Sequence, residues 1–193
     1  MTWAPLENST YDALIAAAAA TAGTDPALIK AHMGVESSFN PAAWNQTDPN
    51  GTSVGLMQIS YGTACALGYT GAPPTAADQA GLMGLFDPAT NIQYGAALIA
   101  QNLAIAASVV DAISGYNAGF SLVFPGFGPR TSLVPSVYVN QAYVDNVQAE
   151  YALVATDFPG STPAAAGKQG FILLALQYSL VVGGVLALVF LRC

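Results

Sequence analysis

Histidine, cysteine and charged residues are all scarce in this chain of 193 residues. His32 is the only histidine, which excludes any site that needs two imidazole ligands. The two cysteines, Cys65 and Cys193, are too few for a disulfide framework or a zinc site of four thiolates. Gly167-Lys168 is followed by glutamine rather than serine or threonine, so no Walker A loop is present. We therefore expect neither a metal nor another cofactor.

The charge that is present is mostly negative. Charged residues make up 8% of the chain, against roughly 25% in an ordinary soluble domain. Four basic residues stand against eleven acidic ones, for a net charge of −7. Residues 1–160 hold all eleven acidic residues and only Lys30 and Arg130 as basic ones. Such a surface repels a phosphate backbone, so no nucleic-acid partner is expected.

Uncharged residues run without interruption from 171 to 191 near the C-terminus. A helix of ~20 residues crosses the hydrocarbon core of a bilayer, so this stretch predicts a single transmembrane helix and a lipid partner. Ser179, Gly183 and Ala187 recur at four-residue spacing within it. Small residues at this spacing let two membrane helices pack closely, which suggests self-association through the three residues.

Composition divides the chain into three parts. Residues 158–170 are rich in proline, glycine and alanine, as in a flexible linker. We therefore predict a folded domain over 1–157, this linker, and the membrane helix over 171–191. The apolar run near the N-terminus follows acidic rather than basic residues, which does not fit a secretory signal peptide.

Helix signals dominate the first 157 residues. Asp25-Pro26 and Asp87-Pro88 each combine an N-cap residue with proline at the first helical position, and alternating strand patterns are rare. The polar stretch 40–53 is expected to form a loop or hairpin. We predict a mostly α domain, with helices at about 10–22, 26–38, 54–61, 76–84, 88–105, 107–116 and 136–155.

Glu36 is the candidate acid. It lies in the last turn of the predicted helix 26–38, beside apolar residues. The negative end of the helix dipole and desolvation both oppose ionisation, so we expect a raised pKa, as a general acid needs. The alternative is an exposed glutamate at a helix end. His32 lies one turn earlier, and we expect it to be neutral and structural.

Four short motifs follow one another along the chain: ESSFNP at 36–41, GLMQI at 55–59, GYNAG at 115–119 and YVDNV at 143–147. Together they resemble the motifs of lytic transglycosylases of the soluble-lytic-transglycosylase type, relatives of goose-type lysozyme. The resemblance covers about residues 10–151. It implies a mostly α, lysozyme-like fold with a cleft for the glycan strands of peptidoglycan, in which Glu36 matches the catalytic acid/base.

The resemblance also implies roles for the residues around Glu36. Met57 and Gln58 match residues that line the saccharide sites, and Tyr116 and Asn117 match the motif that shapes the cleft floor. Tyr143 matches the tyrosine near the carboxylate, and Ser37 matches a residue that orients it. Core packing is the alternative for both tyrosines. The family often carries a charged residue just ahead of the late tyrosine, whereas here residues 140–142 are Asn, Gln and Ala.

The function implied is cleavage of the β-1,4 bond between N-acetylmuramic acid and N-acetylglucosamine, leaving a 1,6-anhydro end. A glycosidase with two carboxylates needs a partner for Glu36, and the first three motifs contain no second acid. One alternative is a hydrolytic muramidase of the goose type, in which Asp48 positions water. Another is a non-catalytic peptidoglycan-binding or structural protein.

A C-terminal anchor without a leader resembles virion-associated transglycosylases of bacteriophages with an internal membrane. This architecture predicts a protein of the virion membrane or host cell envelope that opens the cell wall during genome ejection. The alternative is a bacterial enzyme anchored in the inner membrane and facing the periplasm.

Overall fold

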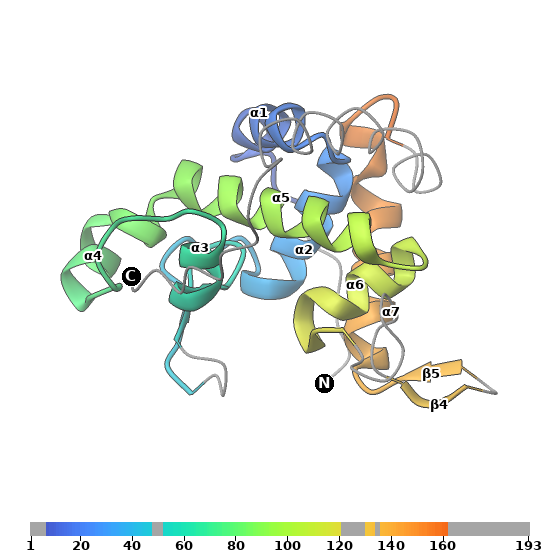
Figure 1. Ribbon diagram of the computed structural model, residues 1–193. Helices are drawn as coiled ribbons and strands as arrows, with labels where there is room; N and C mark the ends of the chain where they lie inside the picture. The colour runs from blue at the N-terminus through green and yellow to red at the C-terminus, as the bar shows by residue number, and fades with distance from the viewer. Residues whose placement is uncertain (1–6, 48–51, 121–129, 134–135, 162–193) are drawn as a thin grey trace, which may run out of the picture.

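The computed structural model describes residues 7–47, 52–120, 130–133 and 136–161. Helices make up most of this part, which confirms the predicted mostly α class (Figure 1). The α-helices are α1 (Asp12–Ala22), α2 (Pro26–Ser37), α3 (Tyr61–Ala66), α4 (Ala76–Gly81), α5 (Pro88–Ile105), α6 (Val109–Ala118) and α7 (Gln141–Val154). The short 3-10 helices are η1 (Gly84–Phe86) and η2 (Ala155–Asp157), and the strands are β1 (Trp44–Asn45), β2 (Ser53–Val54), β3 (Ile59–Ser60), β4 (Arg130–Leu133) and β5 (Ser136–Tyr138).

The predicted cap residues start their helices as expected. The Asp25 carboxylate accepts a hydrogen bond from the Ala27 backbone N–H at 2.9 Å, with Pro26 at the first helical position. The Asp87 carboxylate accepts in the same way from the Thr90 N–H at 2.8 Å. These bonds satisfy N–H groups that have no partner within the helix, so α2 and α5 begin where the sequence predicts.

The predicted helix at 54–61 is wrong. β2 and β3 occupy the ends of this stretch and pair antiparallel through a tight turn, and β1 pairs with β2, giving a small sheet of order β1-β2-β3. Gly55 (φ 74°) and Gln58 (φ 46°) both have left-handed backbone, which a right-handed helix does not accommodate. The expected hairpin in 40–53 is the β1–β2 pair.

The predicted helix at 136–155 begins later than expected. β5 occupies residues 136–138 and pairs antiparallel with β4, and α7 starts only at Gln141. The helix predicted at 76–84 is also shorter, since α4 ends at Gly81 and Leu82 adopts a left-handed conformation. The left-handed backbone of Leu82 ends the helix, and the hydrophobic periodicity of the sequence does not predict that a leucine adopts this conformation.

Helix α2 forms the centre of the core. Its residues 27–34 are all buried, because α1, α5 and α7 pack around it (Figure 1). The α7 contact is the most extensive, and a Cβ at Gly34 would lie 2.6 Å from Glu150 Oε1, so a larger residue there would force the buried Glu150 side chain to move. A helix enclosed in this way presents its last turn, with Glu36, in a fixed position.

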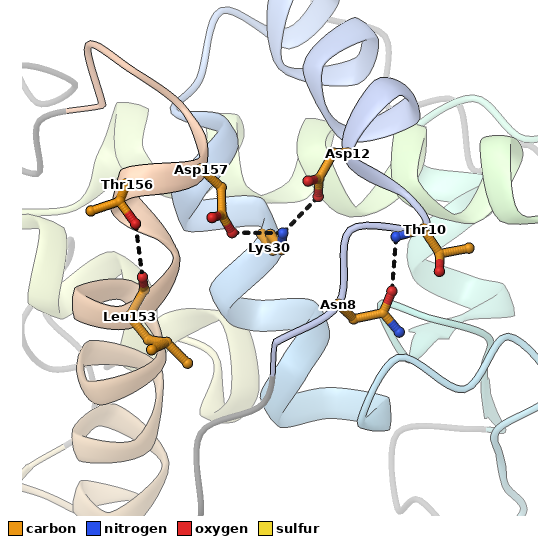
Figure 2. A network of polar contacts seen from close by, with 7 residues as sticks. All are labelled: Asn8, Thr10, Asp12, Lys30, Leu153, Thr156 and Asp157. Carbon is orange, nitrogen blue, oxygen red and sulfur yellow. Dashed lines mark hydrogen bonds and ion pairs between the residues drawn. The ribbon is translucent and has the colours of Figure 1, made fainter.

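Lys30 joins three elements near the other end of α2 (Figure 2). Its side chain is 1% exposed, and Nζ lies 2.7 Å from both Asp12 Oδ1 in α1 and Asp157 Oδ2 in η2. Burial alone would lower the pKa of Lys30, but the hydrogen bonds and charges of the two carboxylates outweigh it and raise the pKa. The ammonium is therefore held charged within the core.

Within the ranges that the structure describes, no helix is long and apolar enough to cross a membrane. The predicted span at 171–191, with Ser179, Gly183 and Ala187, lies outside those ranges, as does most of the predicted linker 158–170. These parts of the sequence analysis stay predictions.

Candidate active site

Glu36 lies half-buried where the central helix ends. Ser38 caps α2 in a left-handed conformation, Phe39 follows in the same conformation, and the Phe39 side chain is buried at 6% exposure. The chain therefore turns sharply after Glu36 and is anchored in the core. Glu36 is one of the residues that line a cavity.

Tyr143 contacts the candidate acid directly. Its hydroxyl, from the first turn of α7, donates a hydrogen bond of 2.7 Å to Glu36 Oε1. Burial and the neighbouring charge of Glu36 raise the pKa of Tyr143 well above its usual value, so the phenol keeps its proton. The carbonyl oxygen of a protonated carboxyl is the better acceptor, so the Tyr143 bond to Oε1 favours a protonated Glu36 with its proton on Oε2.

Tyr116 links α6 to the turn of the small sheet. Its hydroxyl donates to the Met57 carbonyl at 2.8 Å, and burial together with the charge of Glu36 raises the pKa of Tyr116 well above its usual value. The ring lines the cavity beside Glu36. Tyr116 thus packs its ring and shapes the site at the same time.

His32 is buried against the rings of Tyr116 and Tyr143. It is 1% exposed, with its ring centroid 4.6 Å from that of Tyr116 and 6.2 Å from that of Tyr143. Nδ1–H donates to the Leu28 carbonyl at 2.8 Å. Burial lowers the pKa of His32 to about 4, although the backbone hydrogen bond opposes this shift. The imidazole is therefore neutral near neutral pH, as expected from the sequence.

Met57 and Gln58 differ in their relation to the cavity beside Glu36. Met57 is fully buried against Gly95, so its side chain belongs to the core. Gln58 lines the cavity, and its Nε2 donates to the Gly55 carbonyl at 2.9 Å and the Ala43 carbonyl at 3.3 Å. The amide therefore stiffens the turn while facing the site.

Asn91 of α5 is a supporting residue that the sequence analysis missed. It is fully buried, its Oδ1 accepts from the Met57 N–H at 2.7 Å, and its Nδ2 donates to the carbonyls of Val54 and Leu85 at 2.9 and 2.8 Å. A buried amide with all three bonds made fixes the turn that carries Gln58. The available signal was an asparagine on the mostly apolar buried face of this helix, a face that also carries Asn102.

A cavity of about 230 Å³ brings most of the predicted residues together. Its lining is mainly hydroxyls and amides, from Glu36, Asn45, Ser53, Gln58, Ile59, Ser60, Thr63, Leu98, Tyr116 and Asn117. Glu36 is the one carboxylate among these described lining residues. Such a surface suits a neutral, hydroxyl-rich ligand, with one group able to transfer a proton.

Ser37 forms a hydrogen bond within its own helix. Its hydroxyl donates to the Met33 carbonyl at 3.2 Å, so its assignment as a residue that orients Glu36 stays a prediction. Asp48, the water-positioning acid of the muramidase alternative, lies outside the described residues.

A second cavity, of about 240 Å³, lies at the opposite end of α2 and is mostly aliphatic. The one carboxylate among its described lining residues, Asp25, accepts hydrogen bonds from the Ala27 N–H and the Tyr151 hydroxyl. Because Asp25 serves as a helix cap, this cavity offers no comparable acid.

The chain is similar to known proteins in sequence and in fold. A family model described as "Transglycosylase SLT domain" matches residues 13–124. A protein of Enterobacteria phage PRD1 named "Transglycosylase" is 33% identical over 121 residues, which are 63% of this chain and 38% of that protein. The chain thus spans well under half the length of this relative. The X-ray structure of an inactive mutant of the lytic transglycosylase Slt from Pseudomonas aeruginosa superposes with a TM-score of 0.54 at 21% identity, covering 80% of this chain and 25% of that one.

Proposed function

The chain belongs to the transglycosylase SLT domain family, and from this premise we propose that it is a peptidoglycan lytic transglycosylase that uses Glu36 as its single acid and base. The bond cleaved is the β-1,4 link between N-acetylmuramic acid and N-acetylglucosamine, and the product carries a 1,6-anhydro end. The observation that carries this proposal is that Glu36 is the one carboxylate in the described lining of its cavity and accepts a hydrogen bond of 2.7 Å from Tyr143.

The first half of the reaction needs an acid. Glu36 gives the proton on Oε2 to the glycosidic oxygen as the bond from that oxygen to C1 breaks. The Tyr143 hydroxyl continues to donate to Oε1, and this hydrogen bond strengthens as the carboxylate becomes negative. Tyr143 therefore stabilises the charge that develops on Glu36 during proton transfer.

The second half needs a base. The Glu36 carboxylate accepts the proton of the C6 hydroxyl of N-acetylmuramic acid while that oxygen bonds to C1. Glu36 ends the cycle protonated, and no water is consumed. The substrate's own acetamido group takes the place of the second carboxylate that hydrolytic glycosidases place ~5 to 9.5 Å from the first.

Substitution of Glu36 tests the proposal. Glu36→Gln keeps the size of the side chain but removes the transferable proton, so lysis of purified cell walls is expected to fall at least ~10²- to 10⁴-fold. Glu7→Gln is the matched control, because Glu7 is exposed and lies outside the cavity. Activity of Glu36→Gln within about threefold of the parent would place the chemistry on another residue.

The proposal extends to location. The uncharged stretch 171–191 is proposed to anchor the enzyme in a virion membrane or the host cell envelope, with the bacterial inner membrane as the alternative. The full chain is therefore expected to sediment with lipid vesicles, whereas a chain ending after Phe158 stays in the supernatant. Equal sedimentation of the two chains would contradict the anchor.

A further inference from the structure

Asn140 stands at the N-cap of α7, three residues before Tyr143, whose hydroxyl bonds to Glu36. Its backbone carbonyl accepts from the Tyr143 N–H at 2.9 Å and from the Val144 N–H at 3.2 Å. An asparagine at an N-cap usually turns its side chain back to an N–H group of its own helix. Within the described helix α7, the Asn140 side chain makes no such capping bond. It contacts another helix instead.

That helix is α6. The Ser114 backbone carbonyl can only accept, so the Asn140 atom 3.0 Å from it must be the donor, Nδ2. Asn140 Oδ1 then faces the Ser114 hydroxyl, which donates to it at 2.7 Å. The second hydrogen on Nδ2 is donated to Asn117 Oδ1 at 3.1 Å. Because Ser114 is fully buried, the first two bonds attach the start of α7 to the core of the domain.

Tyr138, two residues earlier, makes a second attachment to the same helix. It is 8% exposed, and its hydroxyl donates to Asp111 Oδ1 at 3.1 Å. The α6 partners of Tyr138 and Asn140, which are Asp111, Ser114 and Asn117, recur every three residues and so lie along one face of the helix. The end of β5 and the start of α7 are therefore attached to α6 at successive turns.

The position of Tyr143 depends on this attachment. Tyr143 lies in the first turn of α7, and its bond to Glu36 crosses from α7 to the end of α2. Hydrogen bonds weaken steeply when donor and acceptor are misaligned, and small displacements of catalytic groups cost large factors in rate. A start of α7 that moved away from α6 would carry the Tyr143 hydroxyl off the Glu36 carboxylate.

We infer that Asn140 is a positioning residue of the reaction: by linking the start of α7 to α6, it holds the Tyr143 hydroxyl on Glu36. Asn140 is not among the described residues that line the cavity beside Glu36, so it acts through Tyr143 rather than on the substrate. This inference rests on the proposed function, because it assumes that Glu36 is the acid and base.

The test substitutes Asn140 by the residue of nearly the same shape. Asn140→Asp keeps a good N-cap for α7 and still accepts from the Ser114 hydroxyl, but it cannot donate to the Ser114 carbonyl or to Asn117. Lysis of purified cell walls by the full chain in detergent is measured at several wall concentrations. We expect kcat to fall about three- to tenfold and the apparent KM to stay within about twofold, because Tyr143 acts on the charge that develops on Glu36.

A double-mutant cycle with Tyr143→Phe distinguishes positioning from a merely structural role. In the Tyr143→Phe chain the bond to Glu36 is already lost, so adding Asn140→Asp is expected to lower kcat by less than about twofold further. Losses that multiply in the double variant would overturn the inference, because Asn140 would then act independently of Tyr143. A Tyr143→Phe chain with the kcat of the parent would overturn it as well.

Two further variants keep the test decisive. Ser114→Ala removes the hydroxyl that donates to Asn140, so it is expected to lower kcat about two- to threefold, and only while Tyr143 is present, even if Asn140→Asp does not fold. Asn8→Asp is the matched control, since Asn8 lies before α1 and its Oδ1 accepts from the Thr10 N–H at 2.9 Å, as an aspartate also can (Figure 2). Its kcat is expected to equal that of the parent.

Failure of this inference is distinguishable from failure of the proposed function. If Asn140→Asp and Ser114→Ala keep the kcat of the parent while Glu36→Gln abolishes wall lysis, the inference is overturned and the proposed function stands. If Glu36→Gln keeps its lytic activity, the proposed function is overturned whatever the effect of Asn140→Asp.

Discussion

The buried Lys30 offers a quantitative test of how the domain is held together. Its ammonium is 1% exposed and bonds to Asp12 and Asp157, whose side chains are 30% and 38% exposed. The two acids keep contact with water, so each can be neutralised with limited cost. The lysine has no such access to water, so removal of both acids would leave a cation unpaired in the core.

The expected loss in the free energy of unfolding depends on whether Lys30 keeps one of its two carboxylate partners. Asp12→Asn and Asp157→Asn each leave one carboxylate on Lys30, and each is expected to lower the free energy of unfolding by about 1 kcal/mol. The double variant is expected to lower it by about 3 to 5 kcal/mol, the usual cost of leaving a buried charge without its partner. The two substitutions should therefore be clearly non-additive.

Urea-induced unfolding of the full chain in detergent, followed by circular dichroism, measures these differences. A double variant that loses no more than the sum of the single losses would refute the idea of an enclosed cation. The pH dependence gives an independent check. Because the folded pKa of Lys30 is raised above its unfolded value, the stabilisation is fully present below about pH 10.4 and is lost as the pH rises through the folded pKa.

Two further predictions concern Tyr143, which contacts Glu36, and His32, which packs against Tyr116 and Tyr143. Tyr143→Phe removes the 2.7 Å hydrogen bond that stabilises the Glu36 carboxylate, so wall lysis is expected to fall about tenfold or more while the fold is kept; unchanged lysis would show that the bond does not act in the reaction. The pKa of His32 is lowered to about 4, so between about pH 6.5 and pH 4 the unfolded chain binds a proton that the folded chain does not, and stability falls with falling pH by about 3 kcal/mol in all. His32→Leu is expected to remove this slope, measured as the difference from the parent in urea unfolding; an identical slope in both chains would contradict a buried, neutral His32.

Local signals in the sequence predicted the parts of the fold that depend on neighbouring residues. The Asp-Pro pairs at 25–26 and 87–88 start α2 and α5 because the cap bond spans only two or three residues. The ordered motifs located Glu36 and Tyr143, which lie 107 residues apart and form one hydrogen bond. The role of Tyr143 came from the family resemblance, since no local pattern connects two such distant residues.

What the sequence did not predict depends on tertiary contacts. The turn between β2 and β3 contains buried apolar residues that resemble a helix segment, and it is held by Asn91 from a helix more than thirty residues away. The orientation of Asn117 depends on Asn140 and on one backbone carbonyl of α6. Likewise, no local pattern predicts that Lys30 is buried, because one of its carboxylate partners, Asp157, lies 127 residues later in the sequence.

The mass of the sugar product tests the central claim most directly. Purified peptidoglycan is digested with the full chain, and the soluble fragments are analysed by mass spectrometry. With Glu36 as the single acid and base, each new muramoyl end is expected to be a 1,6-anhydro ring, lighter by one water, ~18 Da, than the reducing end that two-carboxylate hydrolysis leaves. Fragments that carry only hydrated, reducing ends would contradict the transglycosylase mechanism and make Asp48 the first residue to substitute.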